Sequence, residues 1–193
     1  MTSQQIKEVS LKHFAQHGYE GASLAQIADD VGIKKQSIYT HFKGKDELFL
    51  QLCSDACENE LRFVMNFIES NSARPLKEFL FDFLLKYIDR YEKCDSAKFW
   101  IRTAFFPPLH LYRQVMKHVY KYLDKLEELL LPIMKKAVAK GEVNPTIGEQ
   151  RATVAFLALL DGIFVEMIYG SPERLRRRLD ASWYLYWRGL SGN

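Results

Sequence analysis

Apolar residues recur every three or four positions along almost the whole chain, which is the spacing of an amphipathic α-helix. Strict alternation of apolar and polar residues, which would indicate a half-buried strand, is nearly absent. Polar interruptions with glycine or proline separate the helical segments, most clearly residues 69–75 (ESNSARP). The pattern predicts an all-α fold with about nine helices, three of them short and N-terminal.

The three short helices contain a recognisable supersecondary motif. The first helix stops near Gly18, and Ser23 is a natural N-cap for the second. Gly32 ends the second helix in a tight turn, and the third runs through Ile38 towards Phe42. Two short helices joined in this way form a helix-turn-helix, here at about residues 23–42.

The remaining helices are longer. The fourth begins at Lys45, and Pro75 fits the first turn of the fifth. Pro132 lies inside a later long helical pattern, where it should kink or break the helix. The last two helices run roughly over residues 147–169 and 172–188, so that the chain ends in a larger helical bundle.

Positive charge is concentrated in the helix-turn-helix segment. The formal net charge of +3 is unremarkable. Between residues 31 and 45, however, the chain has four lysines and no Asp or Glu. Such a cluster attracts phosphates. Charge alone favours a solvated face on an ordinary helical hairpin, whereas charge together with the helix-turn-helix pattern favours nucleic-acid binding.

In a helix-turn-helix the second helix enters the major groove and presents its first residues to base edges. Lysine and glutamine have the donors that address guanine and adenine edges. Hydroxyl groups, lysines and the amides of a helix N-terminus suit phosphate oxygens. We predict base contacts from Lys34, Lys35, Gln36, Ser37 and Thr40, and phosphate contacts from Ser23, Tyr39, His41, Lys43 and Lys45.

Residues 21–49, GASLAQIADDVGIKKQSIYTHFKGKDELF, closely resemble the N-terminal domain of TetR/AcrR-type transcriptional regulators. The shared features are a small residue and Ser/Thr before the second helix, then "IA..VG", "S.Y.HF" and "K.K.EL". The resemblance is specific over about 50 of the 193 residues. The rest of the chain matches only in helix number, length and a terminal pair of helices, which is a TetR-like architecture.

This resemblance implies a homodimer that binds a palindromic operator in double-stranded DNA and usually represses transcription. It also implies that a small molecule enters the C-terminal domain and releases the DNA. By family pattern, Lys35, Gln36 and Thr40 lie near bases. Family members often have Gly, Pro or Ala where Gln36 stands, so its long side chain is a departure from the pattern.

Aromatic residues crowd the middle third of the chain. An aromatic stripe at helical spacing is usually core, and most of these residues are expected to be core. Their density also suits a pocket for a small hydrophobic or aromatic effector between helices. The predicted pocket residues are Phe83, Tyr87, Trp100, Tyr112 and Met116.

The segment of residues 152–170 is apolar on nearly every side and therefore needs cover all round. The last two helices either close the domain core or meet their symmetry mates in a four-helix interface. The second alternative is favoured, because helix-turn-helix proteins generally read two half-sites. The predicted interface residues are Asp161, Phe164, Val165, Ile168, Leu175, Leu179, Trp183 and Tyr186.

Two domains follow from these assignments. Residues 1–61 are predicted as the DNA-binding domain, including the start of the fourth helix, and residues 62–193 as the ligand-binding and dimerisation domain. The basic cluster at residues 174–179 (RLRRRL) is interpreted as a solvated helix face with ion pairs, and the alternative is a second DNA or membrane contact.

Other candidate chemistry is sparse. Cys53 and Cys57 have the i, i+4 spacing of a metal pair, but nearby ligands are missing and buried thiols are favoured. His110 and His118 are separated by two helical turns, which argues against a shared metal. We find no Gly-rich phosphate loop, nucleophile elbow or zinc-protease motif, so neither an enzyme nor a cofactor is expected.

The first ten residues, MTSQQIKEVS, contain no apolar core of a signal peptide. The longest unbroken apolar run of the chain, residues 154–160, falls far below the ~20 residues that span a bilayer. A cytoplasmic protein is expected, with no membrane partner. The leading prediction is an effector-controlled DNA-binding regulator, and the resemblance implies that it acts as a repressor. The alternatives are a helical ligand-binding or interaction protein without specific DNA binding, and a bundle enzyme.

Overall fold

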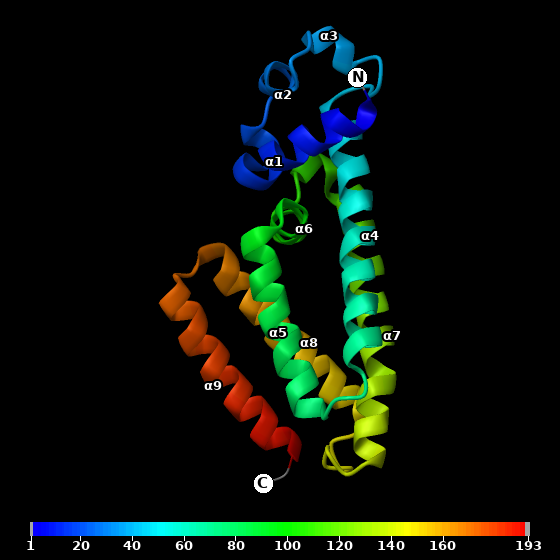
Figure 1. Cartoon of the computed structure of the whole chain (residues 1–193), viewed down its shortest axis with the longest axis vertical. Helices are drawn as coiled ribbons and strands as arrows, with labels where there is room; N and C mark the ends of the chain where they lie inside the picture. Colours follow the sequence, from blue (N-terminus) through cyan, green and yellow to red (C-terminus); the bar gives the residue numbers. More distant parts are fainter. Residues whose placement is uncertain (1, 192–193) are drawn as a thin grey trace. The chain divides into compact units, whose positions relative to one another are not determined.

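The computed structural model describes residues 2–191. Within that range the chain forms nine α-helices, one short 3-10 helix and no β-strand (Figure 1), which confirms the all-α prediction. The elements are α1 (Ser3–Gly21), α2 (Leu24–Val31), α3 (Lys35–Ile38), α4 (Lys45–Asn71), α5 (Leu76–Lys93), α6 (Asp95–Phe105), η1 (Leu109–Leu111), α7 (Tyr112–Ala139), α8 (Glu149–Tyr169) and α9 (Pro172–Ser191).

The chain folds into two compact units. Unit 1 consists of Met1–Leu61 and Tyr91–Tyr122, and unit 2 of Arg62–Arg90 and Leu123–Asn193. The chain passes from one unit to the other inside helices α4, α5 and α7. Unit 1 therefore takes in α6 and the start of α7 as well as the segment predicted to bind DNA. The functional division after residue 61 stays a prediction.

Helix α1 is capped at its start and interrupted near its end. The Thr2 hydroxyl accepts a hydrogen bond from the Gln5 amide, and the Gln5 side chain accepts one from the Thr2 amide, which makes a capping box. Gly18 has φ 70° and ψ −177°, outside the helical region. The helical path thus breaks where the sequence predicts, since a residue without Cβ adopts this conformation without strain.

Helices α2 and α3 form the helix-turn-helix. Ser23 caps α2, and its Oγ accepts a hydrogen bond from the Gln26 amide at 3.2 Å. Gly32 has the left-handed φ of 78°, and its amide closes the end of α2 on the carbonyls of Ala28 and Asp29. Both the predicted cap and the predicted turn are confirmed.

Helix α3 is shorter than predicted. Regular helix ends at Ile38 instead of continuing towards Phe42. The Thr40 hydroxyl donates a hydrogen bond to the Ser37 carbonyl at 2.7 Å. A threonine side chain that bonds backbone in this way competes with helical hydrogen bonding, so residues 39–41 continue as turns.

Aromatic side chains fill the core of unit 1. Phe14 of α1 meets Phe49 of α4 edge-on, with ring centroids 5.0 Å apart, and Phe49 meets Phe99 of α6 at 5.3 Å. All three rings are buried. Helix α6 packs closely on α1 (Figure 1), so it belongs to the same core as the helix-turn-helix.

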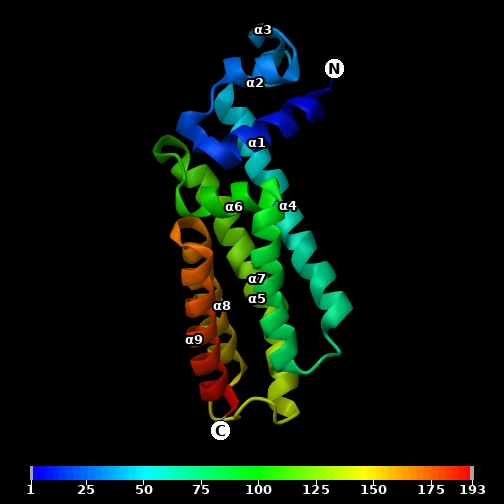
Figure 2. The same ribbon diagram turned by 60° about the vertical axis from the view of Figure 1, so that its left-hand side comes forward.

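In unit 2, α8 and α9 lie side by side (Figures 1 and 2). The Tyr186 hydroxyl of α9 donates a hydrogen bond to the Ala152 carbonyl of α8 at 3.0 Å. Phe83 of α5 meets Phe156 of α8 with centroids 6.0 Å apart. The three helices therefore share one aromatic core.

Helix α7 runs through Pro132 without ending, so of the two predicted outcomes the break is wrong, and the kink stays a prediction. A proline removes one amide and displaces the carbonyl four residues earlier, here that of Glu128. Both residues are exposed, and water can therefore replace the lost hydrogen bond.

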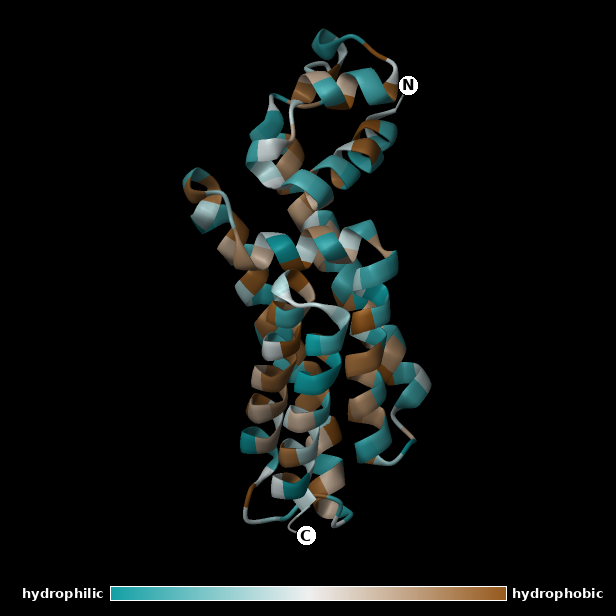
Figure 3. Cartoon of the chain, turned by 90° about the vertical axis from the view of Figure 1, so that its left-hand side faces the viewer, coloured by the Kyte–Doolittle hydropathy of each residue, from teal (hydrophilic) through white to brown (hydrophobic). Residues whose placement is uncertain are grey.

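Hydrophobic positions recur along the helices of unit 2 (Figure 3). Among the described residues, only α8 has the length and apolar character of a membrane span. A helix in the core of a soluble protein meets the same criterion, and 44% of its most apolar window is buried.

Candidate nucleic-acid interface

The helix-turn-helix is anchored by its apolar side and exposes its polar side. Ile27 and Ala28 of α2 and Ile38 of α3 are buried. Their burial fixes α3 against the rest of unit 1 through a single short turn. The start of α3 is left free to face solvent.

The residues predicted to contact bases lie on this free side. Lys34, Lys35, Gln36 and Thr40 are exposed, and Ser37 is half-exposed. Lys34 is the N-cap residue of α3, but its side chain makes no capping bond. The base contacts themselves stay a prediction.

Three of the residues predicted to contact phosphates are exposed. Tyr39 is 51% exposed, and His41 and Lys43 are exposed next to it. The Lys43 amide donates a hydrogen bond to Glu47 Oε2 at 2.6 Å, which fixes the loop before α4 while leaving the Lys43 ammonium unengaged by this bond. Ser23 is half-exposed, and its hydroxyl is within 3.0 Å of Gln26 Oε1.

Lys45, the first residue of α4, is held differently. Its Nζ lies 4.1 Å above the centroid of the Tyr19 ring, in cation–π geometry. Burial lowers the pKa of Lys45, while Glu20 and Asp46 act in the opposite direction. The ammonium is therefore positioned by α1 before any ligand arrives.

Tyr19, Asp46 and His110 form a cluster around this lysine. The Tyr19 hydroxyl donates a hydrogen bond to the Asp46 carboxylate. His110 Nε2 lies 3.4 Å from the same carboxylate oxygen, and its ring meets the Tyr19 ring edge-on at 5.0 Å. Burial, followed by the bond to Asp46, raises the pKa of Tyr19, so the phenol stays protonated.

The sequence did not reveal this cluster. Its members are separated along the chain by 27 residues (Tyr19 to Asp46) and 64 residues (Asp46 to His110). No local spacing links them. The one available signal was Tyr19 directly after the helix-breaking Gly18.

The residues predicted to line an effector pocket differ in exposure. In unit 2, Phe83 and Tyr87 are buried and meet edge-on at 5.0 Å. In unit 1, Trp100 is buried against Tyr122 at 5.3 Å. The other two predicted residues lie on α7, where Tyr112 is exposed and Met116 half-exposed. The effector contacts stay a prediction.

The predicted interface residues also divide by exposure. Phe164, Leu175 and Leu179 are buried within unit 2, so their side chains are already covered in one protomer. Asp161 is exposed. The remaining four are half-exposed: Val165, Ile168, Trp183 and Tyr186.

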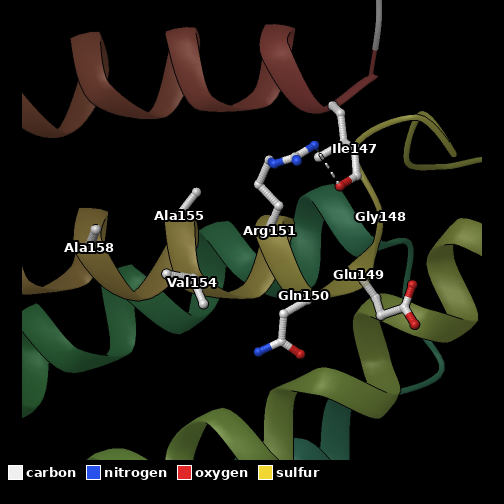
Figure 4. Close-up of a pocket in the computed structure, with 8 residues that line it drawn as sticks. All are labelled: Ile147, Gly148, Glu149, Gln150, Arg151, Val154, Ala155 and Ala158. Carbon is white, nitrogen blue, oxygen red and sulfur yellow. Dashed lines mark hydrogen bonds between the residues drawn. The ribbon is translucent and has the colours of Figure 1, made fainter.

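A shallow hollow of about 680 Å³ lies at the start of α8 (Figure 4). Arg151 extends along one side and donates a hydrogen bond to the Ile147 carbonyl at 3.3 Å. Val154, Ala155 and Ala158 line the apolar side. These residues belong to an exposed stripe of small side chains on α8.

The cysteine pair and the basic cluster of α9 both have contacts that suit a structural role. Cys53 and Cys57 are buried free thiols, and burial raises the pKa of both. Among residues 2–191 no three potential metal ligands converge. In the basic cluster of α9, Arg174 and Arg178 each pair with the buried Glu166 at 2.8 Å, as the ion-pair interpretation predicts.

Comparison with known proteins agrees with this geometry. Residues 6–52 match the family "Bacterial regulatory proteins, tetR family". The biofilm operon icaADBC negative transcriptional regulator IcaR of Staphylococcus aureus is 39% identical over 82 residues, which cover 40% of this chain and 43% of IcaR. The chain thus spans less than half the length of this curated relative.

Two solved structures resemble the chain over nearly its full length. FadR from Bacillus subtilis, in complex with stearoyl-CoA, has a TM-score of 0.70 at 16% identity and covers 98% of this chain and 100% of its own. AibR, in complex with isovaleryl coenzyme A and operator DNA, has a TM-score of 0.67 at 16% identity and covers 94% and 96%. At such identities the likeness shows the fold. Residues 6–52 are thus similar to the TetR family of bacterial regulatory proteins, and the whole chain shares its fold with these two solved structures.

Proposed function

We propose that this protein is a transcriptional repressor that binds a palindromic operator as a homodimer and leaves it when a small hydrophobic effector binds. The observation that carries this proposal is the exposed start of α3, where Lys34, Lys35 and Gln36 face solvent while Ile38 anchors the helix. A short helix fixed in this way suits the major groove of DNA. Acting on DNA, the protein would work in the cytoplasm.

The neighbouring groups support a role in holding the phosphate backbone. Tyr39, His41 and Lys43 follow α3 directly and are exposed. Lys45 opens α4 with its ammonium fixed over Tyr19. Contacts of this kind set the register of a protein on the duplex, and base contacts then supply the sequence preference.

Dimerisation would use the outer faces of α8 and α9. Ala155, Ala158 and Gly162 form an exposed stripe of small residues on α8, with Asp161 beside it. On α9, Leu185 is 69% exposed. A partner helix can approach such a stripe closely, and two copies together would form an isologous four-helix interface. The hollow of Figure 4 lies on the same stripe, so we assign it to this interface and not to the effector.

The effector is proposed to be hydrophobic, because the interior of both units is rich in aromatic rings. FadR and AibR carry acyl-CoA molecules in their solved complexes, which supports a small-molecule effector here as well. We propose no enzymatic activity. The alternative function is a helical ligand-binding or interaction protein without specific DNA binding.

The test begins with selection of bound fragments from genomic DNA, followed by titration of the selected operator and a scrambled duplex. We expect Lys35→Ala and Gln36→Ala to cost about 1–3 kcal/mol on the operator and little on the scrambled duplex. Lys45→Gln should weaken both duplexes alike and lower the salt slope by about one unit for each lost contact. Lys140→Gln, an exposed lysine of unit 2, serves as the matched control.

If the variants of Lys35, Gln36 and Lys45 all lost equal affinity for both duplexes, the predicted base contacts would be refuted. Failure to enrich any fragment would favour the alternative function.

A further inference from the structure

All five histidines of the chain lie in unit 1. The segment that carries the helix-turn-helix is also acidic overall: residues 1–61 hold six lysines and no arginine, against nine aspartates and glutamates. This excess of carboxylates opposes the approach of DNA, despite the local lysine cluster. Histidine is the side chain that changes charge between pH 5 and 8, so protonation there would offset the excess.

Two of these carboxylates are each in contact with a histidine. The first contact joins α1 to the last turn of α2, where His13 Nε2 lies 2.6 Å from Asp30 Oδ2. The His13 side chain is 14% exposed and that of Asp30 64% exposed, so the pair sits at the edge of the helix-turn-helix. His17, with its ring centroid 6.1 Å from that of His13, is the neighbouring titratable group on α1.

The second contact joins η1 to the first turn of α4, through His110 and Asp46 at 3.4 Å. The hydrogen bond from Tyr19 is the largest influence that lowers the pKa of Asp46, and the bond with His110 adds to it. Asp46 is therefore a carboxylate over the whole range in which histidine titrates. It stands directly beside Lys45, a residue proposed to hold a phosphate.

We propose that DNA binding by unit 1 is coupled to proton uptake at His13 and His110, a regulation that rests on the proposed operator-binding function. A protonated histidine forms an ion pair with its aspartate and cancels that negative charge next to the DNA. Phosphates in turn favour the protonated histidines. By linkage, affinity rises as the pH falls through the range of histidine titration and declines above it.

The surrounding charges act in both directions. Around the second contact, the carboxylates of Asp46 and Glu20 raise the pKa of Lys45 against the effect of burial, and the Arg102 guanidinium of α6 donates a hydrogen bond to the Gln16 carbonyl of α1 at 3.3 Å. His118 provides the contrast within the same unit. Burial, then Lys121 and Lys117, lowers its pKa, which disfavours the protonated form of this histidine.

The experiment measures operator affinity between pH 8 and 6 at constant ionic strength, using the full chain. Wild-type protein should bind about tenfold more tightly at pH 6 than at pH 8. The double variant His13→Gln/His110→Gln should lose most of this dependence. His118→Gln is the matched control and should retain it, while His41→Gln measures the share due to a histidine in the proposed phosphate contacts.

A wild-type affinity that does not change with pH, or a double variant with the full wild-type dependence, would overturn the coupling. Absence of specific binding at any pH would instead refute the proposed function. In that case unfolding measurements on the free protein test the two histidine–aspartate ion pairs. The free energy of unfolding of wild type should exceed that of the double variant by an amount that grows as the pH falls. A constant advantage would contradict the ion pairs.

Discussion

Gly32 shows how one residue sets the geometry of the helix-turn-helix. Its φ of 78° is in the left-handed region, yet a Cβ built there would meet no atom within 4 Å. The position therefore requires glycine for its backbone conformation and not for space. Gly189, in the last turn of α9, is equally open but has no positive φ.

These two glycines make a matched pair. Gly32→Ala should lower the free energy of unfolding by about 1 kcal/mol, because alanine is strained in the left-handed region. Gly189→Ala should raise it by about 0.5 kcal/mol, because alanine restricts the unfolded chain and favours helix. Urea unfolding of all three proteins at one protein concentration measures both shifts. A stabilising Gly32→Ala would contradict the role given to this turn.

Residues with local signals could be read from the sequence, and residues brought together by folding could not. Ser23 and Gly32 act on neighbours within four positions, so their roles follow from sequence alone. Tyr19, Asp46 and His110 meet only because α1, α4 and η1 converge. Nothing near any of the three predicts the other two.

At the scale of elements, the turn between α8 and α9 is fixed by a buried acid. Glu166 of α8 is only 3% exposed, and its two carboxylate oxygens accept bonds from Arg174 and Arg178 of α9, each at 2.8 Å. Both arginines are about half-exposed. Removing the partners of a buried carboxylate costs more free energy of folding than removing the partners of a solvated one, because the buried charge is left uncompensated.

The two arginines are therefore expected to act non-additively. Arg174→Ala or Arg178→Ala alone should cost about 1 kcal/mol, since the other arginine still pairs with Glu166. The double variant should cost about 3–5 kcal/mol, because it leaves the buried carboxylate unpaired. Thermal and urea unfolding measure the cycle, with the exposed Arg177→Ala as the control. Additive losses would show that the carboxylate finds another partner or water.

Element boundaries followed the sequence where a cap or a glycine marks them. Helix α9 begins at Pro172, as predicted, with the Ser171 hydroxyl accepting from the Arg174 amide at 3.2 Å. Two boundaries differed. Helix α3 ends early through the Thr40 hydroxyl, and α7 tolerates Pro132 because that turn faces water. Both outcomes depend on local exposure and side-chain rotamers, which hydrophobic periodicity does not encode.

At the scale of the whole molecule, the exposed stripe on α8 is the feature that predicts assembly. Ala158→Arg places a long charged side chain in the proposed interface, where burial without a partner is costly. We expect the dimer dissociation constant to rise by more than about 100-fold in sedimentation experiments, and operator affinity to fall with it. The protomer should remain folded, because the position is exposed.

Gln114→Arg on α7 is the control, since it adds the same charge at an exposed site of unit 1. A dimer that survives Ala158→Arg unchanged would mean that copies meet elsewhere.

The existence of an apolar terminal pair of helices was predictable from the sequence. Which of its residues face outward was not, because nearly every side of α8 is apolar and the choice depends on what α5 and α9 cover.

The continuity of α4, α5 and α7 between the two units has a consequence for engineering. The ring centroid of Phe99 lies 6.2 Å from that of Phe14 and 5.3 Å from that of Phe49. The core that supports the helix-turn-helix therefore includes a residue from the second segment of unit 1, Tyr91–Tyr122. A fragment cut after residue 61 would leave those rings bare and prone to aggregate. A chimera that transplants the DNA specificity of this protein onto another sensor must carry residues 91–122 along with it.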